Sequence, residues 1–119
     1  MTLMNTFIPA TMSADLRKPT AYYPLIFKIG GESFRFGLHY DLAHRDLPQS
    51  SREWVVSDPE SGRMVCRVLA HYKGCVVSSR GVKYREARCF AIDSLETLVQ
   101  RVGEKKIVEK IKATREACK

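Results

Sequence analysis

The chain has 119 residues, of which 45% are hydrophobic and 28% are charged, and its formal net charge is +7. This composition excludes disorder over most of the length, and the length fits one domain. A run of about 18 apolar residues, which a transmembrane helix requires, is absent. The N-terminus lacks a basic segment followed by a long apolar one, so we expect a cytoplasmic protein without a secretory signal.

The excess positive charge is concentrated in residues 63–92. This segment carries seven Lys or Arg and a single Glu, whereas residues 1–62 carry six Lys or Arg against seven acidic residues. Residues 93–119 carry seven basic residues against five acidic ones. Because charge this localised builds a directed electrostatic field, it predicts a polyanionic or acidic partner.

We predict a single domain, 1–119, that begins with an N-terminal arm at 1–21. An antiparallel sheet at 22–92 and C-terminal helices at 93–119 complete it. In the arm, Ser13 is a candidate cap for a short turn at 14–17, which the flanking prolines limit in length.

The first element after the arm is a hairpin in which 22–29 and 32–41 flank Gly30-Gly31. Two consecutive glycines suit the positive φ angles of a two-residue type I′ turn. Side chains alternate along a strand, so this register places six large apolar side chains on one face. The predicted cross-strand pairs are Phe27 with Phe34, Leu25 with Phe36, and Tyr23 with Leu38.

Two further hairpins are expected after a loop at 42–52. In the first, Asp58-Pro59 opens a type I turn and Gly62 takes a left-handed conformation at its exit. The predicted strand pairs are 54–57 with 63–73, and 75–78 with 82–84, the last strand continuing to residue 92. Together the three hairpins predict an antiparallel sheet of five to six strands.

Two helices are predicted to end the chain. Asp93 and Glu96 form a capping box before apolar residues at helical spacing, and Gly103 is suited to the end of that helix. A second helix follows at 104–117. The fold class expected is therefore α+β, with a hairpin-built antiparallel sheet packed by two C-terminal helices. The predicted core is Leu25, Phe27, Phe34, Phe36, Leu38, Trp54, Val68, Leu95, Leu98 and Val102.

The candidate binding residues are the cations of the basic segment together with one histidine. If 63–73 and 82–88 are strands of one sheet, several of these side chains share a face that can contact phosphates. The two tyrosines of this segment fall on the apolar parity, so no stacking platform for single strands is expected. The predicted binding set is Arg63, Arg67, His71, Lys73, Arg80, Lys83, Arg85 and Arg88.

Metal binding and catalysis are the alternatives that the residue pattern leaves open. Cys66, His71, Cys75 and Cys89 have the spacing C-x4-H-x3-C-x13-C, but Cys66 and His71 would point to opposite faces of a regular strand. We therefore predict buried or half-buried thiols, no metal and no cofactor.

The catalytic alternative rests on His39-x-Asp41 and His44-x-Asp46, in which a carboxylate could orient an imidazole. The sequence carries none of the phosphate-binding, hydrolase or zinc-protease motifs. We predict a protein that is not an enzyme.

From Trp54 onward the chain resembles small accessory proteins encoded by phages and prophages. The residues that carry this resemblance are Trp54-Val55-Val56-Ser57, the turn ending Ser61-Gly62, and Ala87, Ala91, Leu95, Leu98 and Val102-Gly103 before a charged last helix. The resemblance implies a protein that binds host or defence machinery, and it transfers no functional residue.

The sequence thus predicts a non-enzymatic binder that engages nucleic acid, or a nucleic-acid-handling complex, through a basic sheet face. The alternative is a protein-directed inhibitor, of the anti-defence or anti-CRISPR kind, that occludes a host protein surface without touching nucleic acid. No membrane partner is expected. The apolar stripe of the last helix leaves a homodimer open.

Overall fold

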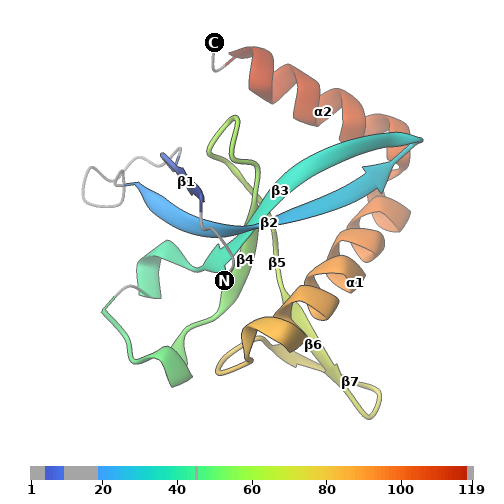
Figure 1. The fold of residues 1–119 in the computed structure, drawn as a ribbon. Helices are drawn as coiled ribbons and strands as arrows, with labels where there is room; N and C mark the ends of the chain where they lie inside the picture. Colours follow the sequence, from blue (N-terminus) through green and yellow to red (C-terminus); the bar gives the residue numbers. More distant parts are fainter. Residues whose placement is uncertain (1–4, 10–18, 45, 118–119) are drawn as a thin grey trace.

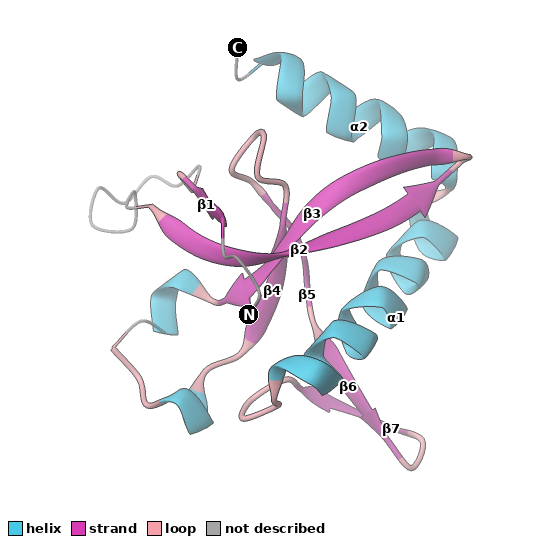
Figure 2. Cartoon of the chain, in the orientation of Figure 1, coloured by secondary structure: helices cyan, strands magenta, loops and turns pink. Residues whose placement is uncertain are grey.

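The computed structural model describes residues 5–9, 19–44 and 46–117, so the turn predicted at 14–17 lies outside the described residues. They form a five-stranded antiparallel sheet, a separate two-stranded sheet and two C-terminal helices (Figures 1 and 2). The predicted α+β class is confirmed. The strands are β1 (Asn5–Phe7), β2 (Thr20–Ile29), β3 (Glu32–Tyr40), β4 (Trp54–Ser57), β5 (Met64–Arg67), β6 (Leu69–Tyr72) and β7 (Cys75–Ser78). The α-helices are α1 (Tyr84–Val102) and α2 (Glu104–Ala117), and the 3-10 helices η2 (Leu42–His44) and η3 (Gln49–Ser51) lie between β3 and β4.

The β2–β3 hairpin forms with the predicted register. Gly30 and Gly31 have φ angles of 58° and 80°, as a type I′ turn requires. The three predicted cross-strand pairs are all present. Figure 1 shows the two strands as a long, curved ribbon that crosses the molecule from the β1 end to α2. This hairpin is the frame on which the rest of the sheet is built.

A strand inside the predicted arm extends the edge of the sheet. β1 pairs with β2, and Phe7 packs edge-to-face on Tyr22 with ring centroids 5.7 Å apart. The Tyr22 ring in turn covers Gly37, where a Cβ atom would lie 2.7 Å from it. Phe7, Tyr22 and Gly37 are all buried. The sheet is therefore apolar on both faces near β1.

The predicted strand at 63–73 is broken at Val68. Its first half, β5, pairs with β4 in the main sheet, whereas its second half, β6, pairs with β7 in the smaller sheet. Val68 is buried at the junction, and its N–H donates to the carbonyl of Trp54 (3.1 Å). The break lets the chain leave the main sheet while Val68 and Ala70 stay in the core.

The hairpin predicted between 75–78 and 82–84 is wrong, because 75–78 pairs with β6 instead. The turn of the β6–β7 hairpin is Lys73-Gly74, and both residues have positive φ, 48° and 82°. Lys is an unusual first residue for such a turn, which is why the sequence did not indicate it. Figure 1 shows this hairpin projecting from the body of the molecule beside α1.

α1 begins at Tyr84, so the predicted helix start at Asp93 and the strand running to residue 92 are both wrong. The buried residues of α1 are Ala87, Ala91 and Leu95, which recur every four residues. This helical spacing starts upstream of Asp93, and the small alanines let the helix approach the sheet closely. Asp93 lies exposed within the helix, where its carbonyl accepts a hydrogen bond from Thr97 Oγ1 (2.9 Å).

The end of α1 and the second helix agree with the sequence. Gly103 follows α1 with φ 100°, and its N–H bonds to the carbonyl of Val99. α2 then buries Ile107 and Ile111 against the core. Neither helix, nor any other helix in the described part of the chain, is long and apolar enough to cross a membrane.

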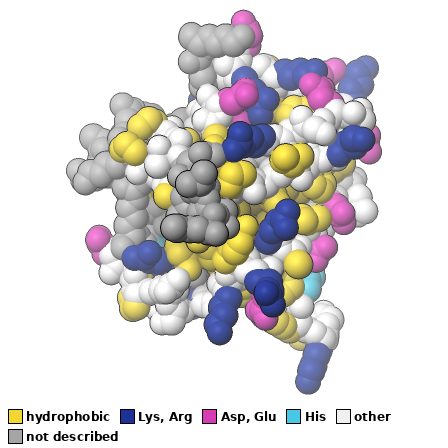
Figure 3. Space-filling model, viewed as in Figure 1, with side chains coloured by type: hydrophobic (Ala, Val, Ile, Leu, Met, Phe, Trp, Pro, Cys, Tyr) yellow, Lys and Arg dark blue, Asp and Glu magenta, His cyan; other side chains and the backbone are white. Residues whose placement is uncertain are grey.

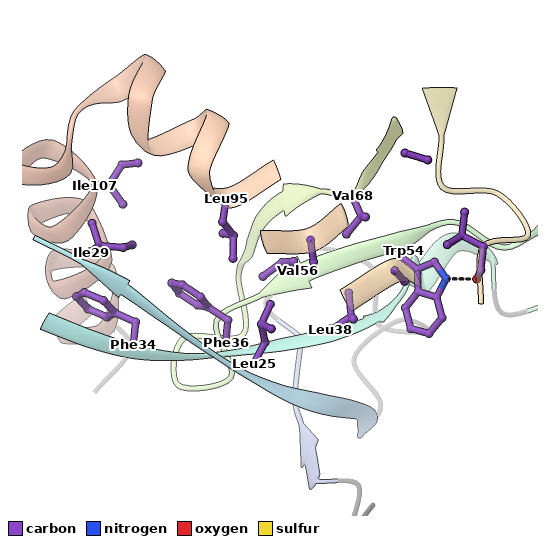
Figure 4. Close-up of a cluster of buried hydrophobic side chains, with 14 of the residues drawn as sticks. Leu25, Ile29, Phe34, Phe36, Leu38, Trp54, Val56, Val68, Leu95 and Ile107 are labelled. Atoms are coloured by element: carbon purple, nitrogen blue, oxygen red, sulfur yellow. Dashed lines mark hydrogen bonds between the residues drawn. The ribbon is translucent and has the colours of Figure 1, made fainter. Parts of the chain in front are cut away.

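One core lies between the concave face of the sheet and the helices (Figure 4). Seven of the ten predicted core residues are buried, whereas Phe27 and Leu98 are partly buried and Val102 is 38% exposed. Trp54 marks one end of the core. Its indole N–H donates to the carbonyl of Val82 (2.6 Å), and its backbone N–H donates to Ser79 Oγ (2.7 Å). These bonds hold the segment before α1 against β4.

Candidate functional site

The predicted basic residues do not share one face of a sheet. Arg63 and Arg67 belong to the region of β5, whereas His71 lies on β6 and Lys73 in the β6–β7 turn. The other four residues lie immediately before α1 or on its first turns: Arg80, Lys83, Arg85 and Arg88. The prediction of a single basic sheet face is therefore wrong, because β5 ends at Arg67 and most of the last predicted strand is helical.

Arg67 is engaged within the protein. Its guanidinium lies 2.6 Å from Asp41 Oδ2 and 3.3 Å from Glu53 Oε2. Burial raises the pKa of Asp41, but the hydrogen bond from the Ala43 N–H and the contact with Arg67 outweigh that effect and lower it. Two carboxylates thus compensate the charge of Arg67, which makes this arginine a weak phosphate ligand.

His44 completes a small polar cluster with the same two carboxylates. Its Nδ1 accepts a hydrogen bond from the Glu53 N–H (3.2 Å), and its Nε2 lies 3.9 Å from Asp41 Oδ2. Asp41, His44 and Glu53 are the one group in the described residues whose ligand atoms are close enough to hold a metal ion. Arg67 already supplies the positive charge there. The alternative zinc ligands considered from the sequence, Cys66, His71, Cys75 and Cys89, do not form such a group among the described residues.

His39, the other candidate base, is buried and fully engaged. Its Nδ1–H donates to the carbonyl of Tyr40 (2.7 Å), so its Nε2 accepts the hydrogen bond from the Ser57 hydroxyl (2.8 Å). The ring lies under Phe7, with ring centroids 5.1 Å apart, and only 4% of His39 is exposed. The pair lies in the interior, where its hydrogen bond joins β3 to β4.

The start of α1 carries a cluster of exposed cations. Arg80, Lys83, Arg85 and Arg88 are all exposed, and none of them forms an ion pair with a residue that the structure describes. Lys83 occupies the N-cap position, and no side chain caps the first N–H groups of the helix. Those N–H groups add positive potential at the same place. Figure 3 shows Lys and Arg side chains over this end of α1, at the border of a hydrophobic patch.

A cleft lined by aromatic side chains opens beside this cluster. Tyr23, Tyr40, Trp54 and Tyr84 line it together with Lys83, and its volume is about 460 Å³. The Tyr23 and Tyr84 rings are stacked with centroids 4.0 Å apart, and the Tyr40 and Trp54 rings lie 4.2 Å apart. The three tyrosines are half-buried. We call this feature the tyrosine cleft.

The polar side chains in and beside the tyrosine cleft are either positively charged or neutral. The Arg52 guanidinium lies over the Tyr40 ring at 5.5 Å, and Gln49 Nε2 donates to the Tyr40 hydroxyl (3.1 Å). No carboxylate lines the cleft among the described residues. An aromatic hollow with cations at its rim suits a flat, electron-rich ring attached to an anion.

Sequence reasoning missed the tyrosine cleft. It located the cations around residue 83 but assigned the neighbouring tyrosines to an apolar sheet face. The cleft joins side chains from β2, β3, β4 and the start of α1, so no local sequence signal marks it. The one usable clue in the sequence is the single Trp54, which begins β4 and pairs with Tyr40 at the end of β3.

Comparison with known proteins adds no relative. No protein-family model matches the sequence, and neither curated proteins nor solved structures give a significant match.

Proposed function

We propose that this protein is a non-enzymatic binder of nucleic acid and that its contact surface is the start of α1 with the adjoining tyrosine cleft. The observation that carries the proposal is that Lys83 and Tyr84, consecutive residues, line the same cleft. A phosphate bound by the exposed cations would thereby place its base beside aromatic rings. This surface replaces the basic sheet face expected from the sequence.

The cations supply the sequence-independent part of the binding. Arg85 and Arg88 lie one helical turn apart, and Arg80 and Lys83 precede them on the loop. Each phosphate that such a side chain neutralises releases counterions, so affinity falls with salt. Arginine has the further advantage of bidentate hydrogen bonding to phosphate oxygens.

The tyrosine cleft should make the protein prefer single-stranded nucleic acid. Duplex bases are stacked on one another, whereas an unpaired base can leave the strand and stack on a side chain. Such stacking contributes about 1–3 kcal/mol per base. We therefore expect single-stranded DNA or RNA to bind more tightly than duplex DNA.

The test is fluorescence anisotropy of labelled single-stranded DNA, single-stranded RNA and duplex DNA at salt concentrations from about 50 to 200 mM. The variant is the triple substitution Lys83→Glu, Arg85→Glu and Arg88→Glu. Its matched control reverses three exposed lysines of α2: Lys105→Glu, Lys106→Glu and Lys110→Glu.

For the wild type, the logarithm of the association constant is expected to fall linearly with the logarithm of the salt concentration. The α1 triple should weaken binding at least about tenfold and flatten the salt slope, because three phosphate contacts are lost. The α2 triple changes the net charge equally and should have a smaller effect. If both triple variants lost the same amount of affinity, the binding would be a non-specific attraction of the nucleic acid to the net positive charge of the protein.

Negligible binding of all three nucleic acids would overturn the proposal. That outcome would favour the protein-directed inhibitor that the sequence left as the alternative. An origin in a phage or other mobile element, and a cytoplasmic location, stay predictions.

A further inference from the structure

A groove separate from the tyrosine cleft lies between the β6–β7 hairpin and α1. It has a volume of about 430 Å³ and is lined from β5, β6, β7 and the second half of α1. Its apolar walls are Val65, Leu69, Val76 and Leu98. We call it the hairpin groove.

The apolar walls of the hairpin groove are open to solvent. Leu69 is 42% exposed and Val76 is 56% exposed. Val76 pairs with His71, and side chains alternate along a strand, so Leu69, His71 and Val76 share one face of the hairpin. A small domain that leaves apolar side chains grouped in a groove has a surface suited to a partner.

All charged side chains that line the hairpin groove among the described residues are basic. They are Arg67 and Arg101, and His71 and Cys66 line the groove beside them. Arg67 is compensated by Asp41 and Glu53, whereas Arg101 is exposed and has no ion pair in the described part of the chain. The groove therefore complements an occupant that is partly apolar and negatively charged.

The hairpin groove differs from the tyrosine cleft because its lining is mainly aliphatic and its one aromatic ring among the described residues is the imidazole of His71. An unpaired base would find only this imidazole to stack on, whereas the tyrosine cleft offers four larger rings. Aliphatic peptide side chains, by contrast, can fill the space between Leu69, Val76 and Leu98. Charge and shape together favour a peptide over a nucleic acid.

The geometry points to a protein partner: we propose that the hairpin groove binds an acidic segment of another protein, with aliphatic side chains against its walls and a carboxylate at Arg101. This is a second surface, which the proposed nucleic-acid function neither needs nor explains. A protein with both surfaces would connect a nucleic acid to an acidic protein.

The test begins with a library of random peptides displayed on yeast and selected against the full-length protein. Counter-selection uses Arg101→Glu, which alters an exposed side chain and should leave the fold intact. Synthetic copies of the enriched peptides are then titrated into the isotopically labelled protein and followed by NMR. The matched control variant is Lys105→Glu, which makes the same charge change outside the groove.

The expected result is enrichment of peptides that combine Asp or Glu with aliphatic residues. They should shift the amide signals of 65–71, 76 and 94–101, bind Arg101→Glu at least about tenfold more weakly, and bind Lys105→Glu normally. Val76→Ser should also weaken peptide binding, because the proposed site uses the apolar wall as well as the cation.

Three results would overturn the inference. They are no enrichment over the counter-selection, enriched peptides without acidic residues, and shifts that map elsewhere. An oligonucleotide that shifts the same amides while no peptide does so would assign the groove to nucleic acid instead. The α1 triple variant should keep peptide binding and Arg101→Glu should keep oligonucleotide binding, so the two proposals fail independently.

Discussion

Arg115, near the end of α2, donates two hydrogen bonds to the buried carboxylate of Asp58 in the β4–β5 turn. The distances are 3.0 Å from Nε to Oδ2 and 2.9 Å from Nη2 to Oδ1. The guanidinium also lies 3.1 Å from Glu60 and over the Phe34 ring. The hydrogen bonds to Asp58 raise the pKa of Arg115, which is charged at every pH of interest. This contact fastens the last helix to the sheet.

We expect Arg115→Ala to lower the free energy of unfolding by about 2–4 kcal/mol, because it leaves the Asp58 carboxylate buried without its cation. Urea denaturation at neutral pH measures the loss. Lys112→Ala is the matched control on the same helix, since Lys112 pairs with Glu32 at 2.9 Å but both are exposed. It should cost less than about 1 kcal/mol. If both variants lost the same free energy of unfolding, the ion pair between Arg115 and Asp58 would contribute no more than an exposed ion pair.

The Asp41–Arg67 contact predicts a pH-dependent stability. The folded state lowers the pKa of Asp41, so the contact contributes stability above the unfolded value of about 4 and loses it as the pH falls. Arg67→Gln should therefore destabilise the protein most near pH 7, and the difference from wild type should shrink toward pH 3. Urea unfolding across this pH range measures the difference in the free energy of unfolding.

The matched control, Arg85→Gln, removes an arginine without such a contact, and its effect should not vary with pH. A difference for Arg67→Gln that stays constant with pH would contradict the prediction.

Tyr84→Ala should separate stacking from charge. The Tyr84 ring lines the tyrosine cleft, so its loss should weaken single-strand binding about tenfold and leave the salt slope unchanged, because no phosphate contact is removed. Tyr72→Ala is the control, since Tyr72 is 47% exposed on β6 and lies outside the cleft. Anisotropy titrations at two salt concentrations measure both quantities. A loss shared by both variants would speak against base stacking at the cleft.

The cysteines should differ in their reactivity toward iodoacetamide. Burial raises the pKa of Cys66 to about 11, so little of its thiol is ionised near pH 8. Cys75 and Cys89 are exposed and should be alkylated first. Peptide mass spectrometry over a time course gives the order, and labelling in urea should bring the three rates together. Rapid modification of Cys66 in the native protein would mean that β5 opens readily.

The parts of the fold that the sequence predicted are those decided within a few residues. The β2–β3 register follows from Gly30-Gly31 together with the alternation on either side, and α2 follows from its own apolar stripe. The start of α1 is mispredicted from the sequence because Asp93 is a good helix cap and the residues before it favour strands. Their helical spacing is visible only once Ala87 and Ala91 are counted as core residues.

The candidate site shows the same limit. Localised charge pointed to the cations at 80–88, because net charge is a property of the sequence alone. It could not show that Asp41 and Glu53 compensate Arg67, or that Tyr23 and Tyr84 stack, since those partners are far apart in the chain. Contacts between distant residues decide which cations are available to a ligand.

Trp54 holds both ends of the β6–β7 excursion. Its carbonyl accepts the N–H of Val68 just before the hairpin, and its N–H donates to Ser79 just after it. Apart from Ala70, every residue between these two anchors is exposed. The two ends of the hairpin thus meet at Trp54, and its exposed residues, 71–78, can vary in length and sequence with little cost to the core. Exchange of residues 71–78 would therefore alter the surface of the hairpin while Trp54 keeps its two ends in place.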